Sequence, residues 1–159
     1  MSGVTAAHGT WFAALAAGAD LDLWGLFISA FISSTLFPGG SEVVVAGMSY
    51  AGRHSPWLLL AVATFGNTLG GLSTYALGRL LARRVPLDAG PEAPGTRHAP
   101  AIRRMRRWGA PALLLSWLPV AGDPLCFAAG WLRVNTLQAA LFIGAGKAAR
   151  YGAIIFFMA

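Results

Sequence analysis

A proline followed four residues later by an acidic residue occurs twice in this chain, both times within apolar sequence. The first copy runs from Pro38 to Glu42 and the second from Pro119 to Asp123. The first acid is followed by an arginine after eleven residues, and the second acid after ten. A glycine lies 13 residues beyond each arginine. Two related units, each with a broken apolar segment ahead of a spanning segment, are typical of membrane transporters built from internal repeats.

The composition is that of an integral membrane protein. Of the 159 residues, 56% are hydrophobic and 11% are charged, whereas about a quarter of the residues in a soluble domain carry a charge. Eight of the twelve basic residues lie between Arg79 and Arg107. This clustering indicates a cytoplasmic loop that faces an anionic lipid surface, and it argues against a nucleic-acid partner.

The first unit is predicted to begin with a re-entrant helical hairpin. The apolar stretch 23–37 has 15 residues, which as a helix reach only about 22 Å and fall short of a hydrocarbon core of about 30 Å. A second short helix is expected at 42–51, with Ser41 as its N-cap. The break between the two helices consists of Pro38, Gly39 and Gly40, which disfavour a continuous helix.

Each hairpin is followed by a segment long enough to span the membrane. The first span is expected at 57–77, where Gly66 and Gly70 form a GxxxG pattern that allows another helix to approach closely. The second unit repeats this order around a break made by Pro119 and Pro124. Its apolar segments are 109–121, 125–132 and the second span, 137–158.

The two spans bracket the basic loop, so we expect an all-α membrane protein of two inverted repeats. Both termini and Arg53 should then lie outside, and the hairpins should enter from opposite faces. The membrane domain is expected at 23–158, with a first repeat at 23–78, the loop at 79–108 and a second repeat at 109–158. Residues 1–22 are predicted to form an interfacial helix or a tail.

Part of the basic loop has the pattern of a short surface helix. Ile102, Met105 and Trp108 recur at helical spacing among arginines, which is typical of a helix lying on a membrane surface. A plain positive-inside topology signal explains the same arginines.

Four charged residues are expected at membrane depth, where each costs roughly 2.5 to 3.5 kcal/mol on insertion scales. They are Glu42, Asp123, Lys147 and Arg150. Lys147 and Arg150 are three residues apart and share a face of the second span. The internal alignment places Lys147 opposite Asn67, so we expect a neutralised polar centre between the hairpins.

Each of these charges also has a structural interpretation. Asp123 followed by Pro124 is typical of a helix N-terminus, with the aspartate as its cap. Glu42 could complement a helix dipole, and the two cations could be counter-ions of the bundle. Arg53 and Arg133 are expected to close the half-helices and contact lipid headgroups. The three histidines are expected to face solvent: His8, His54 and His98.

Four stretches of the chain resemble the YqaA branch of the DedA membrane-protein family, whose members carry a VTT domain. They are 37–42 (FPGGSE), 66–71 (GNTLGG), 119–126 (PVAGDPLC) and 146–151 (GKAARY). The resemblance covers roughly residues 24 to 155 and implies two oppositely inserted re-entrant hairpins. Members of the wider family are associated with moving lipids, including undecaprenyl phosphate and phospholipids, often in dependence on the proton-motive force. By position, the resemblance implies that the functional groups are Glu42, Asp123, Lys147 and Arg150.

We therefore expect a lipid translocase of the bacterial inner membrane that moves a lipid with an anionic phosphate headgroup and is coupled to protons. Ser41 and Asn67 are expected as secondary polar contacts. A non-catalytic membrane assembly or homeostasis factor and a small-ion or solute exchanger stay open as alternatives. No enzymatic activity, cofactor or metal is expected. Membrane lipids are the expected partners, and a homodimer is one assembly that the chain could form.

Overall fold

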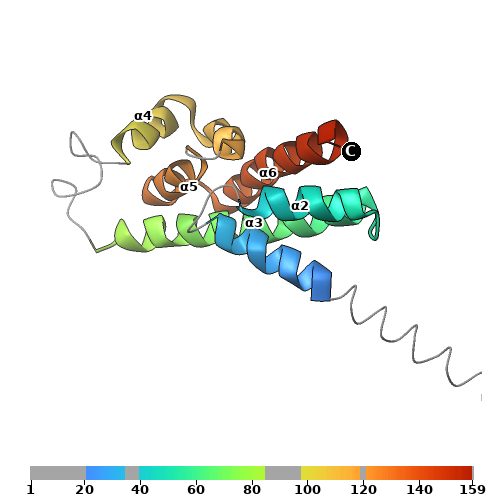
Figure 1. The fold of residues 1–159 in the computed structure, drawn as a ribbon. Coiled ribbons are helices and arrows are strands. Elements are labelled where there is room, and N and C mark those ends of the chain that lie inside the picture. The colour runs from blue at the N-terminus through green and yellow to red at the C-terminus, as the bar shows by residue number, and fades with distance from the viewer. Residues whose placement is uncertain (1–20, 35–39, 85–97, 119–120, 159) are drawn as a thin grey trace, which may run out of the picture.

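A computed structural model describes residues 21–34, 40–84, 98–118 and 121–158, and every regular element in these ranges is a helix (Figure 1). The first helix is Leu21–Ser33. The others are α2 (Gly40–Ala51), α3 (Pro56–Leu81), α4 (Ala99–Trp108), the 3₁₀ helix η2 (Ala110–Trp117), α5 (Gly122–Trp131) and α6 (Thr136–Met158). Pro38, Gly39 and Pro119, predicted to break the hairpins, lie outside the described residues, as does most of the expected segment 1–22.

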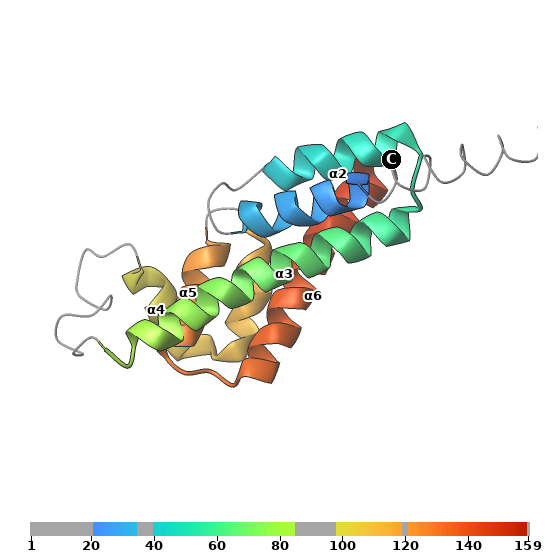
Figure 2. The same ribbon diagram turned by 90° about the horizontal axis from the view of Figure 1, so that it is seen from below.

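The two longest helices, α3 and α6, pack against each other and form the centre of the molecule (Figures 1 and 2). α2 contacts both of them at one end, and α5 contacts both at the other. η2 packs on α5 and α6, and α4 packs on α5 and η2. No contact between α2 and α5 is found within the described ranges.

The buried apolar residues divide into two cores at opposite ends of the α3–α6 pair. The first core consists of Leu26, Ala30, Val45, Leu59, Ala63, Tyr151 and Ile155. The second core includes Tyr75, Ile102, Met105, Leu113, Leu125, Phe127, Trp131 and Ile143. The middle of α3 and of α6 therefore lies between two apolar regions, and this is where Asn67 and Lys147 are buried.

Much of the outer surface is apolar, as expected for a protein surrounded by lipid. Val43, Phe65, Leu141 and Phe157 are examples, at 74%, 62%, 64% and 90% exposed. Soluble monomers rarely expose contiguous apolar patches beyond a few hundred Å².

Within the described ranges, α6 is the one helix that is both long and apolar enough to span a membrane, over Thr136–Phe157 with a mean hydropathy of 1.3. It matches the span predicted at 137–158. α3 has 26 residues and is about 39 Å long, but its glycines and polar residues lower its hydropathy. The first predicted span is thus supported by its length, and the second by both length and composition.

Two predicted helix starts are wrong. Gly40, which was predicted to belong to the break, is the first residue of α2. Ser41 lies in the first turn of α2 instead of capping it. The backbone N–H of Ser41 donates to Ser33 Oγ at 3.2 Å. A serine side chain of the preceding helix therefore accepts from one of the N–H groups that have no partner within α2. α5 is capped at Ala121 without a side-chain hydrogen bond, which places Asp123 and Pro124 inside its first turn.

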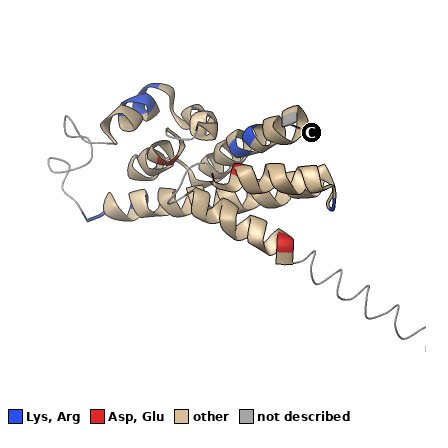
Figure 3. Ribbon diagram, viewed as in Figure 1, with Lys and Arg blue, Asp and Glu red and all other residues tan. Residues whose placement is uncertain are grey.

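The predicted basic helix exists, but its apolar face covers protein rather than lipid. Ile102 and Met105 are each 2% exposed and belong to the second core, whereas Trp108 is 55% exposed. Figure 3 shows the basic residues on the outside of α4.

The prediction that the histidines face solvent is also wrong where the structure tests it. The His98 ring stacks on Phe127 with centroids 4.4 Å apart. The side chain of His54 is only 7% exposed beside Asp22. Each of these two histidines instead lies against a residue distant in the sequence, and His8 lies outside the described residues.

The GxxxG prediction is confirmed, because the helix Leu21–Ser33 lies directly against Gly66 and Gly70. A Cβ atom added to Gly66 would lie 2.7 Å from the Phe27 carbonyl oxygen, and one added to Gly70 would lie 2.7 Å from that of Phe31. Such distances leave no room for any larger residue without a shift of the backbone.

We predict that Gly70→Ala destabilises the protein, because its methyl group would overlap the backbone of the first helix. Overpacking of this kind costs about 1–3 kcal/mol, measurable as a lower unfolding temperature in detergent. Gly25→Ala is the matched control, since a Cβ at Gly25 meets nothing within 4 Å. Equal stability of the two variants would contradict the close packing.

Candidate functional site

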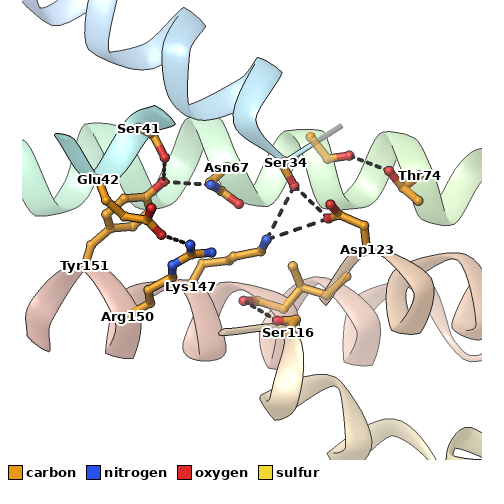
Figure 4. Close-up of polar contacts among 12 residues, drawn as sticks. Ser34, Ser41, Glu42, Asn67, Thr74, Ser116, Asp123, Lys147, Arg150 and Tyr151 are labelled. Atoms are coloured by element: carbon orange, nitrogen blue, oxygen red, sulfur yellow. Dashed lines mark hydrogen bonds and ion pairs between the residues drawn. The ribbon is translucent and has the colours of Figure 1, made fainter. Parts of the chain in front are cut away.

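Four charged side chains meet between the two cores and form two ion pairs (Figure 4). Arg150 pairs with Glu42. Lys147 Nζ lies 4.0 Å from Asp123 Oδ1. The structure thus brings together all four residues that the sequence placed at membrane depth. Both bases come from α6, and the acids come from the first turns of α2 and α5.

Lys147 is the most deeply buried of the four, at 2% exposed. It lies eleven residues from each end of α6, or about 16 Å along the helix in either direction. Its ammonium donates to Ser34 Oγ at 3.4 Å, and that hydroxyl donates to Asp123 Oδ1 at 3.4 Å. Three segments are therefore held at the midpoint of α6: the end of the first helix, α5 and α6 itself.

The cation of the second pair is more accessible than Lys147, whose side chain is 3% exposed. The side chains of Arg150 and Glu42 are 11% and 24% exposed. Because Glu42 lies in the first turn of α2, its negative charge faces the positive end of that helix dipole as well as the guanidinium. This acid therefore has two favourable partners, the start of α2 and the guanidinium of Arg150.

A neutral hydrogen-bond network adjoins the Glu42 pair and is centred on Tyr151. Ser41 Oγ lies 2.8 Å from the Tyr151 hydroxyl, which also accepts a hydrogen bond from Asn67 Nδ2 at 2.6 Å. Asn67 Oδ1 is buried without a hydrogen-bond partner among the described residues. These contacts tie α2, α3 and α6 together beside the ion pairs.

Tyr151 and Ser34 were missed by the sequence analysis. The signal for Tyr151 was available, since it lies four residues after Lys147 and so shares a helix face with it. Ser34 had no comparable signal, because only the tertiary fold brings the end of the first helix to α6.

Two of the predicted site residues lie away from this centre. Arg53 lies two residues beyond α2 and is 3.7 Å from Asp22, with its own side chain 75% exposed. Arg133 follows α5 in a left-handed conformation, with φ 55°. Both arginines lie just beyond the C-terminal ends of the short helices, and their contact with lipid headgroups stays a prediction.

The arrangement offers charge and hydrogen bonding rather than metal ligation. Within the described ranges, no group of three or more histidine, cysteine or acidic side chains could hold a metal ion. The single cysteine, Cys126, is buried in the second core. The chemistry that the site supports is the exchange of partners among two acids and two cations.

We predict that Lys147→Met destabilises the protein, because it leaves Asp123 without its cation. Removing one partner of a fully buried pair costs about 3–5 kcal/mol, and the 28% exposure of the Asp123 side chain lowers the expected loss below that range. Adding Asp123→Asn should recover part of this loss, whereas adding Glu42→Gln should not, because Glu42 pairs with Arg150. A double-mutant cycle in unfolding free energy tests both statements. Strict additivity for Lys147 and Asp123, or an equal recovery by Glu42→Gln, would contradict the pairing.

The comparisons with known proteins found close relatives of this chain. The inner membrane protein YqaA of Escherichia coli is 44% identical over 134 residues, covering 84% of this chain and 89% of the relative. A protein of the same name from Shigella flexneri matches equally. An uncharacterised protein of Haemophilus influenzae is 44% identical over 82% of the chain and 83% of its own length.

No family model and no solved structure matches the sequence. The identity and the coverage of the relatives are high enough to decide the family nonetheless. The chain belongs to the YqaA family of DedA-like proteins of the bacterial inner membrane.

Proposed function

We propose that this protein moves lipids with a phosphate headgroup across the bacterial inner membrane, using Glu42 as a proton-sensitive partner of Arg150. The observation that carries the proposal is the meeting of two short-helix N-termini with two cations at the middle of α6. Helix N-termini carry partial positive charge and bind phosphate readily. Together with Lys147 and Arg150, they make the membrane centre attractive to an anionic headgroup.

Exchange of partners at Arg150 would provide the transport step. While Glu42 is charged, it occupies the guanidinium; once protonated, it would release the guanidinium to a lipid phosphate. Arginine suits this step because its planar fork binds carboxylate and phosphate in the same geometry. Lys147 is held by both Ser34 and Asp123, and it would contribute a fixed positive charge.

The protein would consist of two inverted repeats, and equivalent contacts in its two halves support this arrangement. Gly66 of α3 packs on the helix Leu21–Ser33, and Gly146 of α6 packs on η2, where an added Cβ would lie 2.7 Å from the Leu114 carbonyl oxygen. The second short helix of each half contacts the long helix of the other, α2 with α6 and α5 with α3. Alternating access in repeat-built transporters moves one repeat against the other around such a central site.

The inverted arrangement predicts that the two ends of the molecule face opposite sides of the membrane. In a Cys126→Ser background, Tyr50→Cys should react with an impermeant thiol reagent added outside, because Tyr50 is 95% exposed. Arg104→Cys on α4 should react only from the cytoplasm. Labelling of both positions from the same side would rule out this topology.

Translocation itself is tested with the purified full chain in proteoliposomes. The protein should accelerate the flip of fluorescent phosphatidylglycerol, and the rate should depend on pH. Glu42→Gln should lower the unfolding temperature far less than Lys147→Met does, because the amide oxygen can still accept a hydrogen bond from Arg150. It should nonetheless remove the pH dependence, because the amide cannot titrate. If this variant misfolds, the acid is structural and the non-catalytic assembly factor is favoured. If the pH dependence survives, Asp123 replaces Glu42 as the candidate, and ion flux without lipid flip would favour the exchanger.

A further inference from the structure

The polar site opens sideways into an apolar groove between α2 and α6. The groove has a volume of about 670 Å³, within the range of about 300–1,000 Å³ typical of small-molecule sites. Its walls are made by residues of α2 and α6 together with Trp117 at the end of η2. The lining residues are Glu42, Val43, Ala46, Gly47, Trp117, Arg150, Ala153 and Ile154.

We propose that this groove binds one hydrocarbon chain of a phosphate-bearing lipid, with the phosphate on Arg150. This assignment rests on the translocase function for its ligand class and adds a location, the lateral face between α2 and α6. The groove would be the place where a lipid leaves the bilayer and meets the central charges.

The shape of the groove depends on small side chains. Gly47 and Ala153 lie on facing helices and are exposed, and a Cβ added to Gly47 would meet nothing within 4 Å. Val43 and Trp117 beside them are 74% and 48% exposed. The groove is therefore open to the outside along an apolar wall, where the surrounding medium in a membrane is hydrocarbon.

Charge decides which lipid fits. Arg150 has five N–H donors, whereas a carboxylate such as Glu42 accepts at most two of them in a bidentate pair. No other side chain that lines the groove carries a strong acceptor, and the Trp117 indole is itself a donor. A phosphate would supply the missing oxygens, most favourably once Glu42 is protonated, so an anionic headgroup complements the groove better than the apolar helix of a second copy would.

The experiment uses the full chain in vesicles that contain phosphatidylglycerol with a photoreactive diazirine in one acyl chain. Crosslinked peptides should map to α2 and α6 at the groove. Ala153→Leu fills the groove and should reduce this labelling at least about fivefold, as should Gly47→Leu. Gly25→Leu is the control for adding the same side chain to open surface elsewhere, and it should label as the wild type does.

A diacylglycerol probe with the same acyl chain tests the phosphate contact. The wild type should label more strongly with the phospholipid than with the diacylglycerol. Arg150→Lys keeps the positive charge beside Glu42 but lacks the planar guanidinium, so it should remove most of that preference. Equal labelling by the two probes, or labelling spread evenly over the outer surface, would show annular lipid only and overturn the proposal. Disulfide-linked dimers formed by Val43→Cys in the Cys126→Ser background would overturn it as well, in favour of a dimer interface.

Flip rates measured in the same vesicles separate this inference from the proposed function. Groove labelling without any lipid flip would retain the binding site and remove the translocase. Lipid flip that persists at the wild-type rate in Ala153→Leu, with labelling lost, would retain the translocase and remove the groove as its entry site.

Discussion

The buried cation at the midpoint of α6 is the constraint on which the rest of the structure depends. Lys147 is 2% exposed, and an ammonium taken out of water at membrane depth needs both a counter-charge and hydrogen-bond acceptors. Asp123 supplies the charge and Ser34 supplies a hydroxyl. Since these two residues belong to α5 and to the end of the first helix, one cation fixes where both elements meet α6. The short length of α5 agrees with this placement, because its first turn must lie at the midpoint of α6 rather than at one of its ends.

The polar centre lies between the two apolar cores. Tyr75 and Ile143 belong to one core and Leu59 and Ile155 to the other, so each long helix is anchored at both ends and polar in the middle. Close glycine contacts add to this, with Gly130 of α5 lying against the backbone of α3 at Tyr75. Anchoring at the ends allows side chains in the centre to change partners without unfolding either core, as the proposed transport would require.

The sequence predicted the outline of the fold and all four central charges, but not their pairing. Charged residues inside apolar segments are conspicuous, and helix lengths follow from where prolines and glycines interrupt the apolar runs. The partner of each charge depends on how α2 and α5 lie against α6, which composition does not specify. The same reason explains the errors at Ser41 and Asp123, whose local patterns predict caps but whose side chains turn to Tyr151 and Lys147 instead. Tertiary contacts overrode local preference where a buried polar group needed a partner.

The two ion pairs differ in how accessible their cations are, so each pair suits a different role. Lys147 is nearly inaccessible and hydrogen-bonded to Ser34 as well as paired with Asp123, so replacing its partner would leave several buried polar groups unsatisfied. Arg150 borders an open groove, and its side chain is 11% exposed, against 3% for Lys147. A ligand that arrives along the groove can reach the guanidinium without displacing any packed element. Under the proposed mechanism, exchange of partners would therefore cost least at Arg150, and the Lys147 pair would hold the helices in place.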